Sequence, residues 1–124
     1  MRENYKKLIR PSEFIDDEPV GIAAIHKNRL PRPIEDEHWV YVSERLWMRC
    51  LAFGSAYNLH FSSTIEPIID AVLGPEQCES FDEELEFLSC IVNDPAFCEA
   101  VQAIRNEVTK VMNRKDMRLI ISPP

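Results

Sequence analysis

The sequence predicts a mainly α-helical protein, a compact bundle of about four helices after a proline-rich, partly irregular N-terminal segment in which a short β element is possible. Three observations support this fold class: four apolar stripes with helical spacing, four prolines before residue 34, and the composition of a globular protein, with 45% hydrophobic residues. A chain of 124 residues has the size of one ordinary domain. We therefore expect a single domain in which residues 1–34 pack on a helical core formed by residues 35–124.

The N-terminal segment and the C-terminal end are the least regular parts of the predicted fold. Each proline removes a backbone donor and disfavours helix at the residue before it. The prolines of the N-terminal segment are Pro11, Pro19, Pro31 and Pro33. Between them, VGIAAIHK at residues 20–27 suits a short helix or an edge strand. The closing sequence MRLII, at residues 117–121, suits a short strand or an apolar tail laid on the bundle, and its length does not decide.

The first long amphipathic pattern starts after residue 34. Apolar side chains recur every three or four residues, as on the core face of a helix. They are Trp39, Val42, Leu46, Cys50, Phe53 and Tyr57. Carboxylates at residues 35–37 would interact favourably with the N-terminal end of such a helix. However, the β-branched and aromatic residues at 38–42 would suit a strand equally well, and the helix would then begin near Ser43.

A second helix is predicted between residues 63 and 73. Ser63 and Glu66 have the spacing of a capping box, and Gly74 followed by Pro75 is typical of a helix end. The apolar face of this helix would consist of Ile65, Ile68, Ile69, Val72 and Leu73.

Similar signals predict the third and fourth helices. Ser80 and Glu83 are again three residues apart, before a third apolar stripe. This stripe consists of Phe81, Leu85, Leu88 and Val92. Asp94 and Pro95 have the residue types of an N-cap and a first helical position, and the last helix should run to about Met112. Its apolar stripe consists of Phe97, Val101, Ile104, Val108 and Val111.

Charge is distributed unevenly along the chain. The net charge is −7, from 21 acidic and 14 basic residues. No Lys or Arg occurs between Arg49 and Arg105, whereas ten acids do. These acids are Glu66, Asp70, Glu76, Glu79, Asp82, Glu83, Glu84, Glu86, Asp94 and Glu99. Because the basic residues are divided between the two ends, a basic face that binds nucleic acid is disfavoured, and a basic partner is favoured instead.

The sequence gives little support to an active site or a metal centre. The three histidines, His26, His38 and His60, fall in three different predicted elements, without a metal-binding or nucleotide-binding motif. The four cysteines are Cys50, Cys78, Cys90 and Cys98. We expect them to be free thiols packed as small hydrophobic groups, and we expect no metal, no cofactor and no catalytic residues. The absence of a signal peptide or a long apolar span predicts a cytoplasmic protein.

The acidic run from residue 76 to residue 86 is the strongest candidate for a binding surface. It has six acids in eleven residues, just before and within a predicted helix. They could form a solvated face whose first acids interact with the helix dipole. They could also form an anionic docking surface, with Phe87 as an aromatic anchor off the apolar stripe. The predicted partner-binding residues are Glu76, Glu79, Asp82, Glu83, Glu84, Glu86 and Phe87.

These observations predict a small acidic binding protein that neutralises a basic protein. The leading hypothesis is an immunity or antitoxin-type inhibitor, of the kind found in bacteria, that covers the cationic cleft of a nuclease-like toxin. One alternative is a helical regulatory adaptor that binds a peptide or a partner helix. Another is a small helical enzyme or ligand-binding domain with a pocket near Trp39, Tyr41 and Trp47. No direct contact with nucleic acid or with a membrane is expected.

Overall fold

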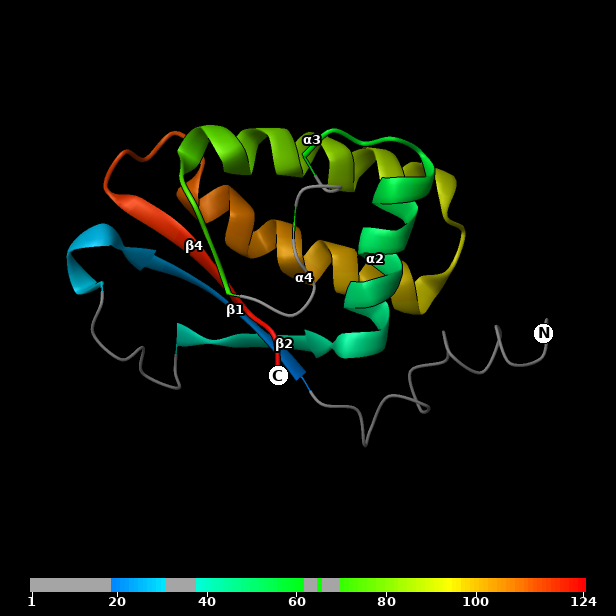
Figure 1. Ribbon diagram of the computed structural model, residues 1–124, viewed down its shortest axis with the longest axis horizontal. Helices are drawn as coiled ribbons and strands as arrows, with labels where there is room; N and C mark the ends of the chain where they lie inside the picture. The colour runs from blue at the N-terminus through cyan, green and yellow to red at the C-terminus, as the bar shows by residue number, and fades with distance from the viewer. Residues whose placement is uncertain (1–18, 31–37, 62–64, 66–69) are drawn as a thin grey trace.

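The computed structural model describes residues 19–30, 38–61, 65 and 70–124, which form a four-stranded sheet and three α-helices (Figure 1). In chain order the elements are β1 (Pro19–His26), the short 3₁₀ helix η2 (Lys27–Arg29), β2 (Val40–Ser43), α2 (Glu44–Ala56), β3 (Ala71–Leu73), α3 (Pro75–Ile91), α4 (Pro95–Val111) and β4 (Met117–Ser122). Figure 1 shows α4 lying along the sheet, with α3 on the far side of α4 from the strands. The architecture therefore places α3 at the outside of the molecule.

The fold mixes α and β structure, and the prediction of a mainly helical, four-helix bundle is wrong. The strands form an antiparallel sheet in the order β2-β1-β4-β3. Ile22 of β1 pairs with Val40 of β2 on one side and with Ile121 of β4 on the other. The two segments that the sequence left undecided, residues 20–27 and 117–121, thus belong to the two central strands, except for Lys27, which begins η2.

Burial on both faces explains why β1 and β4 were difficult to predict. The buried residues that face the helices include Val20, Ile22, Leu119 and Ile121. The buried residues of the opposite face are Ala23, Ile25 and Ile120, with Leu30 and Trp39 packed against them. A strand that is covered on both faces has a continuous apolar run and no alternation, so its pattern resembles that of a short buried helix. β1 is consequently an interior strand instead of a helix or an edge strand.

Residues 40–43 form a strand, the second of the two alternatives that the sequence allowed, and α2 begins after it. β2 ends at Ser43, and Ser43 Oγ accepts a hydrogen bond of 3.5 Å from the backbone N–H of Leu46, so Ser43 is the N-cap of α2. The β-branched residues Val40 and Val42 fit the pleated surface of a strand better than the first turn of a helix. The prediction of a helix that begins near Ser43 is confirmed, and the prediction of helix at Val40 and Val42 is wrong.

The helix predicted over residues 63–73 is wrong where the structure describes it. Ala71–Leu73 forms the edge strand β3, which pairs with β4. Leu73 is buried in the core and Val72 is exposed, as the alternation of a strand requires. The proposed capping residues Ser63 and Glu66 lie outside the described residues, so that capping box stays a prediction.

Gly74 and Pro75 begin α3 instead of ending a helix. Pro75 occupies the first turn, where its missing N–H has no intrahelical acceptor. The backbone N–H of Gly74 donates to Gln77 Oε1 at 2.9 Å. Ser80 and Glu83 therefore lie inside α3, and the capping box predicted for them is wrong.

The signals of the last helix are confirmed. Asp94 Oδ1 accepts a hydrogen bond of 3.0 Å from the backbone N–H of Phe97, and Pro95 is the first residue of α4. The helix ends at Val111, with Met112 as its C-cap. The buried apolar residues of α4 include Phe97, Val101, Ile104, Val108 and Val111, as predicted.

Candidate functional site

α3 separates the seven predicted partner-binding residues into two groups. Its buried side packs on the core through Cys78, Phe81, Leu85 and Leu88. Its exposed side carries five of the predicted residues, Glu76, Glu79, Glu83, Glu86 and Phe87, which we call the outer face of α3. The other two, Asp82 and Glu84, have hydrogen-bond partners within the protein.

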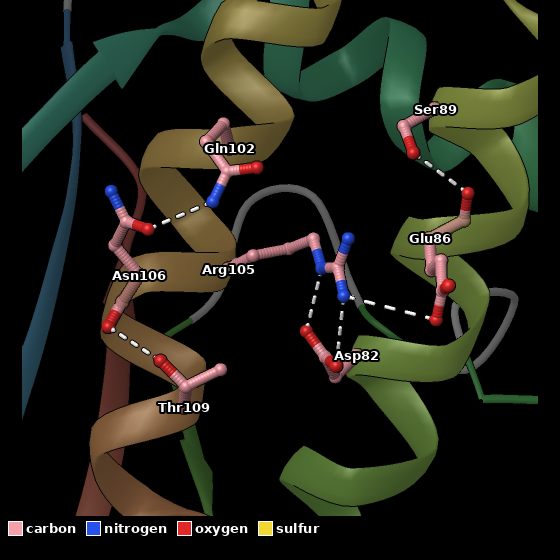
Figure 2. A network of polar contacts seen from close by, with 7 residues as sticks. All are labelled: Asp82, Glu86, Ser89, Gln102, Arg105, Asn106 and Thr109. Carbon is pink, nitrogen blue, oxygen red and sulfur yellow. Dashed lines mark hydrogen bonds and ion pairs between the residues drawn. The ribbon is translucent and has the colours of Figure 1, made fainter.

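Asp82 is held in a polar network between α3 and α4 (Figure 2). Arg105 Nε donates to Asp82 Oδ1 at 2.8 Å, and Arg105 Nη2 donates to Asp82 Oδ2 at 3.2 Å. The Asp82 side chain is 12% exposed and the Arg105 side chain is 23% exposed. The hydrogen bond from Arg105 to this carboxylate raises the pKa of the guanidinium above its ordinary value. Asp82 thus links two helices and is not available to a partner.

Glu86 lies at the border between this network and the solvent. Its Oε2 is 3.8 Å from Arg105 Nη2, a distance too long for a hydrogen bond, and its side chain is 63% exposed (Figure 2). An exposed ion pair of this kind contributes little to stability. Glu86 can therefore turn toward a partner without loss to the fold.

Glu84 lies on a different side of α3 from Asp82 and is also hydrogen-bonded within the protein. Its Oε2 accepts a hydrogen bond of 2.8 Å from the backbone N–H of Phe61, which ties the chain after α2 to α3. Burial, and secondly the charge of Glu84, raise the pKa of the Cys50 thiol from 9.0 to about 12. Glu84 is half-buried and has a structural role.

Phe87 belongs to an exposed apolar patch on the outside of α2 and α3. The Phe87 ring is in edge-to-face contact with the Tyr57 ring, with 5.8 Å between centroids and 76° between planes. Tyr57 is 52%, Phe87 41% and Ile91 40% exposed. We call Tyr57, Phe87 and Ile91 the aromatic patch. It adjoins the acids of the outer face, because Glu83 lies one helical turn before Phe87 and Ile91 one turn after it.

Two members of the aromatic patch were missed by sequence reasoning. Tyr57 was assigned to the core stripe of the first long helix, which is wrong because α2 ends at Ala56 and Tyr57 is its exposed C-cap. Ile91 lies four residues after Phe87, so its spacing carried a usable signal. Tyr57 is distant in the sequence, and no local pattern links it to Phe87.

The histidines have separate polar surroundings. His26 Nε2 lies 3.2 Å from Asp116 Oδ2, and His38 Nε2 lies 3.0 Å from Arg29 Nη1. His60 is exposed. Within the described ranges, no group of three or more His, Cys, Asp or Glu side chains is arranged to hold a metal ion.

The aromatic residues proposed to line a ligand pocket lie on opposite faces of the sheet. Trp47 belongs to the core beneath the helices and is 1% exposed. Trp39 packs against the other face, over Gly21, where an added Cβ would come within 2.8 Å of its Cε3 atom. Tyr41, paired with Gly21 across β1 and β2, is exposed. The sheet therefore keeps Trp47 away from Trp39.

The four cysteines are free thiols in different environments. Cys50 and Cys78 are buried in the core, as expected. Burial is the main cause that raises the pKa of Cys78 from 9.0 to about 12, against a lowering by Arg118. Cys98 is half-buried, and its Sγ donates to the carbonyl oxygen of Val92 at 3.2 Å. Cys90 is exposed, so the expectation that all four thiols pack as hydrophobic groups is wrong for Cys90.

Comparisons of the chain with protein-family models, with curated proteins and with solved structures find no match. Among the helices of the described residues, none has both the length and the apolar character that a bilayer span requires. The interpretation of the site therefore depends on its own chemistry. Its two components are the row of exposed carboxylates on α3 and the aromatic patch beside it.

Proposed function

We propose that this protein binds and neutralises a basic protein partner, as an immunity or antitoxin-type inhibitor of a nuclease-like toxin in the cytoplasm. The observation that carries the proposal is the outer face of α3, where four exposed carboxylates precede the exposed Phe87 along one side of the helix. No Lys or Arg of α3 itself balances them, because residues 50–104 contain none. The protein acts by blocking the cationic cleft of its partner and uses no cofactor.

The chemistry of a nuclease explains why such a face would inhibit it. A nuclease must hold a polyanion, so its cleft presents Lys and Arg side chains to phosphates. A row of carboxylates on a rigid helix offers the same charge to that cleft. Long-range attraction accelerates the encounter, and the partly exposed aromatic residues supply contact area once the two surfaces meet.

Two acids of the run have hydrogen-bond partners inside the protein, which strengthens the assignment of the docking surface to the acids of the outer face. Asp82 and Glu84 are neutralised or hydrogen-bonded inside the protein, and they account for part of the acidic run by structure alone. The acids of the outer face have no comparable role in the fold. Like charges on neighbouring helical turns repel one another, so a solvated helix face would tolerate Lys or Gln there equally well.

An immunity gene lies immediately downstream of its toxin gene. The test therefore uses the product of the gene immediately upstream of the one that encodes this chain. We expect the upstream product to be a basic protein with nuclease activity that this chain inhibits stoichiometrically. Glu83→Lys should weaken the inhibition strongly. The matched control is Glu99→Lys, which makes the same charge change at an exposed position of α4 and should inhibit like the wild type. An upstream product that is not inhibited, or equal effects of the two variants, would refute the proposal.

A groove along α2 supports a second candidate function, an adaptor that holds a peptide or a partner helix. The groove has a volume of about 590 Å³. It is lined by Glu44, Arg45, Met48, Arg49, Ala52, Phe53 and Ala56. Binding at this groove would be largely apolar and would persist at high salt, whereas binding at the outer face of α3 would weaken as salt is added.

A further inference from the structure

We propose that the aromatic patch, Tyr57, Phe87 and Ile91, receives an arginine side chain of the partner. This inference rests on the proposed function and specifies the chemistry of the group that is recognised. The outer face of α3 alone would attract any cation. The combination of exposed aromatic rings and carboxylates on adjacent helical turns favours a planar cation over a spherical one.

The ring geometry provides a stacking surface. Tyr57 and Phe87 meet edge to face, with 76° between their planes, so the two rings do not stack and the edge of one ring covers only one side of the other. Tyr57 is about half exposed, and Phe87 keeps 41% of its surface exposed. A guanidinium group stacks on such a ring through both dispersion and attraction to the π electrons. Ile91 extends the apolar surface by one helical turn and can cover the methylene stem of the same arginine.

One exposed carboxylate adjoins the rings and can complete the recognition. Glu83 is exposed and lies one turn before Phe87 on α3. Glu84, three residues before Phe87, already accepts the hydrogen bond from the backbone N–H of Phe61 and is not part of this contact. A guanidinium can stack on a ring with its plane while its edge donates two parallel hydrogen bonds to a carboxylate. An ammonium group cannot satisfy both contacts in this way.

The test compares two peptides of equal charge, nona-arginine and nona-lysine, by NMR titration of the full chain. We expect nona-arginine to bind about fivefold more tightly, the effect of one exposed cation–π contact. It should shift the resonances of Tyr57, Phe87 and Ile91 most. Phe87→Leu, a substitution at an exposed position, should abolish the preference while binding of nona-lysine persists. Tyr41→Leu, at an exposed aromatic residue of β2, is the matched control and should keep the preference.

The outcomes separate this inference from the proposed function. If both peptides bind with equal affinity, or if Phe87→Leu retains the preference for arginine, the inference is refuted. In that case a loss of affinity in Glu83→Gln for both peptides would leave the acidic docking surface intact. If Glu83→Gln changes neither affinity, the outer face of α3 does not bind cations, and the proposed function fails together with the inference.

Discussion

The two sides of α3 place neighbouring carboxylates in opposite roles. Asp82 is buried and forms a bidentate pair with Arg105, whereas Glu83, the next residue, is exposed on the outer face. One step along a helix turns the side chain by about 100°, which suffices to move an acid from the border of the core to the solvent. The acidic run is therefore not one surface: some of its charges serve the fold, and the others are free to serve a partner.

Removal of the structural acid should have the largest effect on stability. Asp82→Ala leaves the Arg105 guanidinium partly buried and without its bidentate partner, and we expect a loss of about 3 kcal/mol in the free energy of unfolding. Urea denaturation measures it. The double variant Asp82→Leu with Arg105→Met removes both charges and should recover most of this loss. If Asp82→Ala lowers the free energy of unfolding by less than about 1 kcal/mol, the range of an exposed pair, Asp82 does not have a structural role.

The buried thiols predict a loss of stability at alkaline pH. Cys50 ionises above pH 9 in the unfolded chain, whereas the folded protein raises its pKa to about 12. Between these values the unfolded state releases a proton that the folded state keeps, so the free energy of unfolding falls as the pH rises. At pH 10.5 the contribution of one such thiol has fallen by about 2 kcal/mol.

Cys50→Ala isolates this contribution. At pH 7 the variant should be less stable than the wild type by about 1 kcal/mol, because it loses buried apolar volume. Near pH 10.5 the order should reverse. Denaturation curves at the two pH values measure both quantities, and a constant difference between wild type and variant would contradict the burial of a neutral thiol.

A smaller effect on stability should distinguish the Glu84 variant from the Glu83 variant. Glu84→Ala removes the acceptor of the Phe61 N–H and should cost about 1–2 kcal/mol, the range for a backbone donor left without its partner. Glu83→Ala should change stability by less than about 0.5 kcal/mol, as is usual at exposed helix positions. Thermal unfolding of the two variants side by side gives this difference. Equal losses would mean that the two acids do not differ in their structural role.

Local signals predicted α2, α3 and α4 approximately, but they missed the sheet and placed a helix where part of it, β3, is found. The cap at Asp94 and the stripe of α4 depend on residues within a few positions of one another, and both are confirmed. The central strands β1 and β4 are stabilised by each other across most of the chain, and no local pattern contains that pairing. Gly74 with Pro75 was misjudged because the same residue pair is compatible with the end of one helix and the start of the next.

The candidate site was likewise predicted only in part. The acids and Phe87 were identified from composition, and the helical phase set by Phe81, Leu85 and Leu88 could have shown that Asp82 lies at the border of the core. Its partner Arg105 is on another helix and could not be found from spacing. Glu83 was expected to cap a helix, yet it is exposed inside α3, which makes it the suitable position for a charge change.

The association rate with the upstream gene product, measured by stopped flow at increasing salt, tests the central claim most directly. At low ionic strength Glu83→Lys should associate about tenfold more slowly than the wild type, because steering acts on the encounter. The difference should shrink as salt screens the charges, and Glu99→Lys should follow the wild type throughout. If Glu83→Lys associates at the wild-type rate at every ionic strength, the outer face of α3 is only a solvated helix face.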